Sequence, residues 1–203
     1  MPVTVRSTPM SRHSLVAIIV ALFVAFSGSG LSAQNANPSV IMETSLGTIT
    51  IELDQANAPK SVENFLAYVR SGFYHGTVFH RVIRGFMIQG GGMTADLNRK
   101  ATQAPIENEA TNGLKNAKGT IAMARTADVN SATAQFFINT GDNRSLDHRS
   151  TAPQEFGYAV FGQVTDGLDV VDKIDAVETG TQGPYRDVPN ETILIESVSV
   201  KTP

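Results

Sequence analysis

The chain of 203 residues contains no cysteine. It therefore cannot form disulfides or thiolate metal sites, and thiol catalysis and a lipid-modified amino-terminal cysteine are both excluded. A protein without disulfides depends on its hydrophobic core for stability. This composition fits a bacterial periplasm better than a disulfide-rich extracellular matrix.

The chain also lacks an excess of positive charge. Its 16 basic and 19 acidic side chains give a net charge of −3. The first 33 residues carry two of the basic side chains and no acidic one, so the remainder has a net charge of −5. This balance favours solubility and argues against a nucleic-acid partner, which would require a basic surface.

The longest uninterrupted apolar run covers only residues 15–26. A membrane span needs about 20 apolar residues, so this run is too short for one. The basic residues Arg6 and Arg12 precede it, and a stretch of small residues ending at Ala33 follows it. This pattern is typical of a secretory signal. We expect a signal peptide at residues 1–33 with cleavage after Ala33 and export to the periplasm; the alternative is an uncleaved amino-terminal anchor.

After a short polar lead at residues 34–39, the pattern predicts one mainly β domain at residues 40–203. Apolar or alternating segments predict strands, and a further strand-like run surrounds Gln89. The other predicted strands lie at residues 40–44, 47–53, 78–83, 120–124, 135–139, 158–164 and 192–200.

Two segments show helical spacing of apolar residues. One begins at Pro59 and ends near Gly72, and the other covers residues 168–177. Residues 93–118 and 141–157 are polar and irregular, which predicts long loops. About eight strands and two helices indicate a closed eight-stranded antiparallel β-barrel capped by two α-helices.

The most informative segment for function is residues 79–91. It places the guanidinium of Arg81 close to the apolar pair Phe86 and Met87 and to the amide of Gln89. An arginine has too high a pKa for proton transfer, but its five donors can hold a carbonyl oxygen in one orientation. Taken alone, an arginine such as Arg81 is in most cases a surface residue in a salt bridge, and the apolar residues could belong to the core. The combination nevertheless points to chemistry on a peptide without bond cleavage.

The same segment resembles the signature of the cyclophilin-type peptidyl-prolyl cis-trans isomerases. The resemblance rests on residues 79–83 (FHRVI) and 85–91 (GFMIQGG), and it continues in 135–138 (QFFI) and 160–164 (VFGQV). It extends from about Val40 to Val200 and is most similar to a periplasmic bacterial member. It implies the same capped eight-stranded barrel.

The resemblance also implies roles for individual residues. Arg81 would be the catalytic arginine, assisted by Phe86 and Gln89. Seven further residues would bind substrate, in a proline pocket, at its rim or through the substrate backbone. They are Met87, Ala124, Arg125, Gln135, Phe137, Leu146 and Tyr158.

Four positions depart from the best-known pattern of this family. Arg84 replaces a proline before Gly85, and Arg125 replaces an asparagine whose backbone contacts substrate. Ser145 stands where eukaryotic cyclophilins often carry a tryptophan, so we expect weak cyclosporin binding. Tyr158 takes the position of a pocket histidine.

Other catalytic patterns are weak. His75, His80 and His148 have no compact metal-ligand spacing, and the three glycines at 90–92 lack the lysine of a phosphate-binding loop. Asp147 and His148 are adjacent but have no obvious nucleophile nearby. We therefore expect no cofactor and no metal.

The predicted function is isomerisation of Xaa-Pro bonds in exported proteins, assisting their folding. The partners would be unfolded or partly folded proline-containing polypeptides, with no nucleic acid and no membrane after signal cleavage, and the protein would be a monomer. The alternative is a module that binds proline-containing segments as a chaperone with little turnover.

Overall fold

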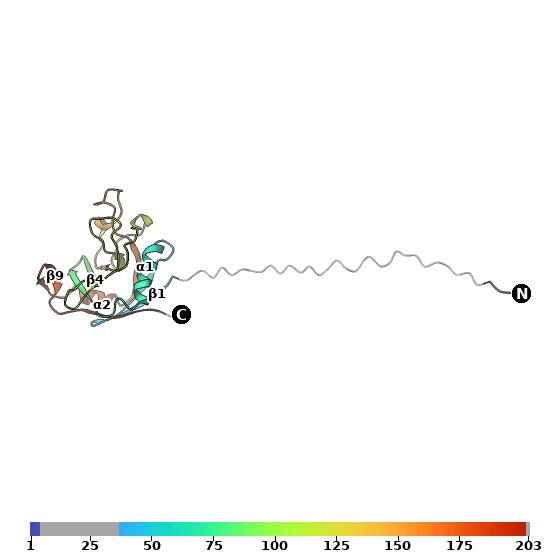
Figure 1. Ribbon diagram of the computed structural model, residues 1–203, viewed down its shortest axis with the longest axis horizontal. Helices are drawn as coiled ribbons and strands as arrows, with labels where there is room; N and C mark the ends of the chain where they lie inside the picture. Colours follow the sequence, from blue (N-terminus) through green and yellow to red (C-terminus); the bar gives the residue numbers. More distant parts are fainter. Residues whose placement is uncertain (5–36, 202–203) are drawn as a thin grey trace. The chain divides into compact units, whose positions relative to one another are not determined.

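Eight antiparallel strands close into a barrel in the computed structural model, which describes residues 1–4 and 37–201 (Figure 1). The strand order around the barrel is β1-β10-β3-β4-β6-β5-β7-β2. The barrel strands are β1 (Ser39–Thr44), β2 (Gly47–Leu53), β3 (Thr77–Ile83), β4 (Met87–Thr94), β5 (Thr120–Met123), β6 (Phe136–Asn139), β7 (Val160–Asp166) and β10 (Leu194–Val200). The predicted eight-stranded barrel is confirmed.

Two helices complete the core of the barrel. Helix α1 (Pro59–Arg70) starts with proline at its first turn, where the missing N–H costs no hydrogen bond, and α2 (Leu168–Asp175) follows β7. The apolar stripes of both helices belong to the same buried cluster as the barrel interior. The ring of Phe65 on α1 meets the rings of Phe136 and Phe161 at centroid distances of 5.7 and 5.3 Å. The two predicted helices are confirmed.

The two faces of each strand have separate apolar clusters. Ile88 on β4 lies opposite Ile138 on β6, and Ile138 lies opposite Ile121 on β5; all three are fully buried in the main core. Successive side chains of a strand point to opposite faces. Met87 and Phe137, the neighbours of these core residues, belong to a second, smaller cluster. This second cluster therefore lies on the outer face of the barrel.

A separate two-stranded sheet lies outside the barrel and was not predicted from the sequence. It is a hairpin of β8 (Thr179–Gln182) and β9 (Tyr185–Pro189), and β9 packs against β3. The hairpin is short and mostly polar, so it has no apolar alternation from which strands could be predicted. Its turn contains Gly183 and Pro184, which are typical turn residues.

The predicted loops contain little regular structure. Two short 3₁₀ helices, η1 (Ala110–Asn112) and η2 (Arg144–Leu146), lie within them. The loop predicted to begin at residue 93 begins two residues later, because Met93 and Thr94 belong to β4. Several predicted strands also begin or end one or two residues away from the observed limits, as with β7, which begins at Val160 rather than at Tyr158.

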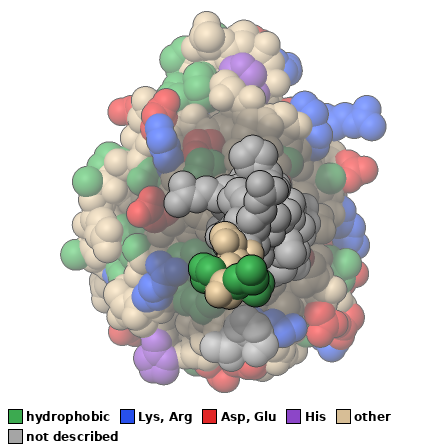
Figure 2. Space-filling view, turned by 90° about the vertical axis from the view of Figure 1, so that its right-hand side faces the viewer, with side chains coloured by type: hydrophobic (Ala, Val, Ile, Leu, Met, Phe, Trp, Pro, Cys, Tyr) green, Lys and Arg blue, Asp and Glu red, His purple; other side chains and the backbone are tan. Residues whose placement is uncertain are grey.

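The predicted signal peptide falls almost entirely within residues 5–36, outside the described residues. Within the described part of the chain, no helix has the length and apolar character needed to cross a membrane. Acidic and basic side chains are interspersed over the described surface seen in Figure 2, with no large patch of either sign.

Candidate active site

A row of directly opposite residues crosses five barrel strands and forms the base of the candidate site. Arg81 on β3 lies opposite Gln89 on β4, and Gln89 lies opposite Phe137 on β6. Phe137 lies opposite Ala122 on β5, which in turn lies opposite Val160 on β7. Residues directly opposite in antiparallel strands share one face of the sheet. The barrel thus brings the predicted guanidinium, amide and aromatic ring together on its outer face.

The apolar part of the site is the second cluster, which we call the outer cluster. It has four buried members and six partly buried ones: Met87, Ala122, Phe137, Val160, and Ile83, Phe86, Leu114, Ala124, Leu146 and Tyr158. Every apolar residue predicted for the proline pocket and its rim is among them. Ile83, Leu114, Ala122 and Val160 were missed. Strand alternation relative to Phe137 could have identified Ala122 and Val160, whereas nothing in the local pattern pointed to Leu114.

The two amides predicted for the site, Gln89 and Gln135, contact each other. Nε2 of Gln89 donates a hydrogen bond to Oε1 of Gln135 at 3.0 Å, and both residues are partly buried. Gln135 lies immediately before β6 rather than within it. The pair leaves Oε1 of Gln89 and Nε2 of Gln135 available to a substrate backbone, one as acceptor and the other as donor.

Arg81 lies at the open side of the site. Its side chain is 44% exposed, and its Nε donates to Oδ2 of Asp187 on β9 at 3.4 Å. Sequence reasoning missed Asp187, which is 106 positions away along the chain. Only the packing of the hairpin against β3 brings the two side chains together.

Arg125, predicted at the rim, has its guanidinium occupied by the loop at residues 141–157. It donates to the backbone oxygens of Gly157 at 3.0 Å and Pro153 at 2.9 Å. Its guanidinium carbon also lies 4.8 Å from the centroid of the Tyr158 ring. That ring meets Phe137 edge to face at 5.6 Å. Arg125 therefore holds the loop and one wall of the outer cluster, and its guanidinium has few donors left for a substrate.

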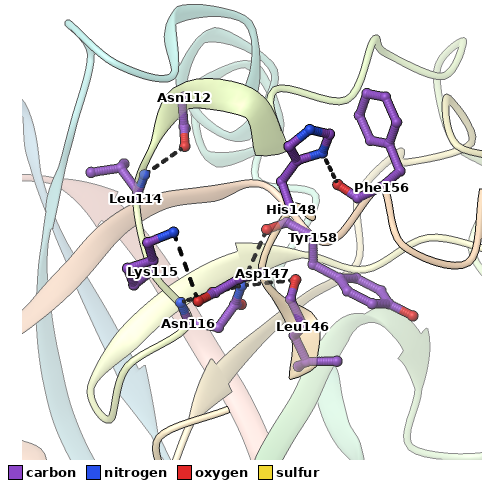
Figure 3. A network of polar contacts seen from close by, with 9 residues as sticks. All are labelled: Asn112, Leu114, Lys115, Asn116, Leu146, Asp147, His148, Phe156 and Tyr158. Atoms are coloured by element: carbon purple, nitrogen blue, oxygen red, sulfur yellow. Dashed lines mark hydrogen bonds and ion pairs between the residues drawn. The ribbon is translucent and has the colours of Figure 1, made fainter. Parts of the chain in front are cut away.

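A buried polar network supports the same wall (Figure 3). Oδ1 of Asp147 accepts hydrogen bonds from the backbone N–H of Asn116 at 2.8 Å and from its side-chain amide at 3.2 Å. The same amide donates to the backbone oxygens of Leu146 and Tyr158 at 3.2 and 3.4 Å. Sequence reasoning missed Asn116, because an isolated asparagine in a polar loop is usually a surface residue. The network fixes the backbone that carries two pocket residues.

Asp147 and His148 do not form a catalytic pair. Nδ1 of His148 contacts the backbone oxygen of Phe156 at 2.8 Å, whereas the Asp147 carboxylate is directed to Asn116 and Lys115 (Figure 3). Within residues 1–4 and 37–201, no three acidic or histidine side chains converge in a way that could hold a metal ion.

His80 is the buried titratable neighbour of Arg81 on β3. Its side chain is largely inaccessible, and its Nδ1 has no hydrogen-bond partner in the described structure. Burial lowers the pKa of His80 from 6.5 to about 4; a backbone contact with Val78 opposes this shift, and the positive charges of Arg81 and Arg99 add to it. His80 is therefore neutral at pH 7 and adds no charge to the site.

Residues 39–200 match the family described as "Cyclophilin type peptidyl-prolyl cis-trans isomerase/CLD". The chain belongs to this family. Curated relatives with isomerase names support this assignment. This cyclophilin is 59% identical over 162 residues to "Peptidyl-prolyl cis-trans isomerase cyp18" of Streptomyces antibioticus, covering 80% of this chain and 98% of that protein. It is 50% identical over 192 residues to "Peptidyl-prolyl cis-trans isomerase A" of Dickeya dadantii, covering 94% and 98%.

Solved structures show the same fold. A cyclophilin of Cryptosporidium parvum, crystallised in the presence of the dipeptide Ala-Pro, matches this cyclophilin with a TM-score of 0.68 and 26% identity. The match covers 81% of this chain and 99% of that one. AquaCyp293 of Hirschia baltica matches with a TM-score of 0.63 and 27% identity, covering 80% and 73% of the two chains. The capped barrel predicted from the sequence is thus the fold of this enzyme family.

Proposed function

We propose that this cyclophilin isomerises Xaa-Pro bonds in exported polypeptides and thereby assists their folding in the periplasm. The observation that carries the catalytic part is the row of Arg81, Gln89 and Phe137 on the outer face of the barrel. The secretory pattern of residues 1–33 supports the location.

The outer cluster is the proposed site for the proline ring. Met87, Phe137 and Leu146 contribute apolar side chains to it. Burying an apolar ring of this size contributes about 1.5–3 kcal/mol. Once the ring is held there, the preceding residue can turn about the C–N bond while the proline remains fixed.

Arg81 is the proposed electrostatic catalyst. The uncatalysed rotation has a barrier of about 20 kcal/mol because the nitrogen lone pair is delocalised into the carbonyl. Twisting the bond localises this pair on the proline nitrogen, which then becomes a better hydrogen-bond acceptor. A guanidinium that donates to it stabilises the twisted state more than the planar one. A charged hydrogen bond contributes about 1.5–3 kcal/mol, which corresponds to about one or two decades in rate.

The Gln89–Gln135 pair is proposed to hold the substrate backbone. It lies between Arg81 on β3 and Phe137 on β6, so its free oxygen and free N–H can bind peptide groups beside the proline. Held at both ends, the substrate loses rotational freedom everywhere except at the bond that must turn. The reaction forms and breaks no covalent bond.

The isomerase activity is tested by the cis-to-trans rate of a short Xaa-Pro peptide, measured with wild type, Arg81→Ala and Arg70→Ala. Arg70 lies exposed at the end of α1, and its loss removes the same charge without touching the outer cluster. We expect Arg81→Ala to lower kcat/KM about 30- to 100-fold while peptide binding is largely kept, and Arg70→Ala to behave as wild type. No acceleration by wild type over buffer would instead identify a binding module.

The location is tested by expressing the full chain in a Gram-negative host and determining the amino terminus of the protein released from the periplasm. We expect cleavage after Ala33. An intact amino terminus in the cytoplasmic fraction would contradict export, and an intact chain in the membrane fraction would indicate the uncleaved anchor.

A further inference from the structure

Asp187 is the one side chain in the described structure that forms a hydrogen bond or ion pair with Arg81. The contact joins Oδ2 of Asp187 to Nε of Arg81 at 3.4 Å, and the two side chains are 40% and 44% exposed. The carboxylate does not come from the barrel that carries Arg81. It comes from β9, in the separate two-stranded sheet.

The backbone at Asp187 adopts a conformation that most residues avoid. Its φ is +60°, and among the described residues only Leu97 is another non-glycine with positive φ. Glycine adopts the left-handed region at least cost, and aspartate tolerates it better than most side chains. Observed backbone strain of this kind is a ground for a functional hypothesis.

The strain coincides with a β-bulge. Gly180 lies opposite Val188, and Gln182 lies opposite Tyr185, so one residue of β8 faces two residues of β9, one of which is Asp187. A bulge turns the side chains of its strand away from the regular alternation and is frequent beside active sites. Here the irregularity accompanies a carboxylate that reaches the guanidinium on β3.

The hairpin is anchored well enough to hold that carboxylate in place. Val188, the next residue, is 6% exposed, and Pro189 is also buried. The backbone N–H of Asn190 donates to the oxygen of Glu178 at 2.9 Å and closes the base of the hairpin. Asp187 is therefore presented from a fixed element rather than from a free loop.

The atom that Asp187 engages decides what remains for the substrate. Arginine has five N–H donors, and occupation of Nε leaves the four on the terminal nitrogens. An exposed arginine without a partner would distribute over many rotamers, and ordering it at the moment of catalysis would cost entropy. With Nε held, the guanidinium is ordered before substrate arrives, and its terminal N–H groups stay free to donate.

We propose that Asp187 is a positioning residue that orients Arg81 for transition-state stabilisation. This inference rests on the catalytic role proposed for Arg81. It assigns a catalytic purpose to the hairpin, none of whose residues belongs to the main buried cluster of the barrel. Asp187 itself does not contact the substrate.

The test is a kinetic double-mutant cycle on a short Xaa-Pro peptide with Asp187→Asn, Arg81→Ala and the double variant. We expect Asp187→Asn to lower kcat about threefold to tenfold with little change in KM. In the Arg81→Ala background the same substitution should have no further effect, because Asp187 acts only through Arg81. A ¹⁵N spectrum should show the Arg81 Nε–H signal moving to the position of a solvent-exposed arginine in Asp187→Asn.

Two further variants separate positioning from folding. Asp187→Gly removes the carboxylate and relieves the backbone strain, so we expect the same loss of kcat with an unchanged or raised Tm. Glu178→Gln is the matched control. Glu178 forms a more exposed ion pair with Arg84 at 3.5 Å at the base of the same hairpin, and its neutralisation should leave the rate as in wild type.

Several results would overturn the proposal. Wild-type kcat in both Asp187 variants, while Arg81→Ala is impaired, would refute positioning and leave the role of Arg81 intact. An increase in rate would show instead that Asp187 competes with substrate. An equal loss in the Arg81→Ala background would show that Asp187 acts by another route. A wild-type rate in Arg81→Ala would refute both proposals at once, and this pattern differs from all the others.

Discussion

The side-chain amide of Gln89 donates a hydrogen bond to the side-chain oxygen of Gln135 at 3.0 Å. Two residues that the sequence suggested separately are thus one hydrogen-bonded unit, formed where the end of one loop meets β4. The pair fixes which amide atom of each residue remains free. Displacing either partner should therefore disturb both.

The contact between Gln89 and Gln135 can be tested by adding a side-chain atom at Gly92 on β4. A Cβ at this position would lie 2.7 Å from Nε2 of Gln135, too close for an undisturbed side chain. We expect Gly92→Ala to displace Gln135 and lower kcat/KM about 2- to 10-fold, the loss of roughly one neutral hydrogen bond. Gln135→Ala removes the atoms that clash, so adding Gly92→Ala to it should change little. Equal losses in both backgrounds would show that the effect comes from β4 itself.

Phe136 and Phe137 form a matched pair on the two faces of β6. Phe136 is fully buried and meets Phe65 and Tyr74 edge to face, whereas Phe137 belongs to the outer cluster. We expect Phe136→Ala to lower the free energy of unfolding by about 3–5 kcal/mol, a typical loss for a core aromatic. Phe137→Ala should cost less stability but lower kcat/KM on the order of 10- to 100-fold, because the proline ring loses its apolar wall. Urea unfolding and the isomerisation rate distinguish the two, and the reverse pattern would place the proline site elsewhere.

Asp147 should support both folding and substrate binding. In Asp147→Ala the buried N–H of Asn116 loses its acceptor, which costs about 1–3 kcal/mol of the free energy of unfolding. Because the network holds the backbone of Leu146 and Tyr158, KM should rise as well. Asp147→Asn keeps an oxygen at the same place and should restore most of both losses. A full loss in Asp147→Asn would show that the charge, rather than the hydrogen bond, is required.

The lowered pKa of His80 predicts how the free energy of unfolding depends on pH. Burial lowers its pKa from 6.5 to about 4, so between these values the unfolded chain binds a proton that the folded protein does not. The free energy of unfolding should consequently fall as pH decreases from 6.5 to 4, by up to about 1.4 kcal/mol per pH unit and about 3 kcal/mol in total.

Urea unfolding of wild type and His80→Gln across this range measures that contribution. The variant lacks the titrating ring, so its free energy of unfolding should depend less steeply on pH, with the difference from wild type at pH 8 as the reference. Identical slopes in the two proteins would contradict the neutral, buried state of His80.

Local sequence predicted most of the fold. The alternation in residues 47–53 and the helical spacing after Pro59 specify a strand and a helix by themselves, because each repeats an apolar residue at the period of its own element. The β8–β9 hairpin could not be found in this way, since its residues are mostly exposed and its strands are held by backbone hydrogen bonds and by contact with β3. The hairpin is therefore stabilised by the neighbouring strand β3 rather than by an apolar pattern of its own.

The sequence by itself determined the chemical inventory: an arginine, two amides and several apolar residues in an order that resembles one family, with no cysteine. Only the tertiary structure decided how these residues meet. The barrel register aligned Arg81, Gln89 and Phe137, and the hairpin brought Asp187 to Nε of Arg81 across 106 positions. Side-chain periodicity is a local property of the chain, whereas the partner of an exposed charge depends on which distant element packs beside it.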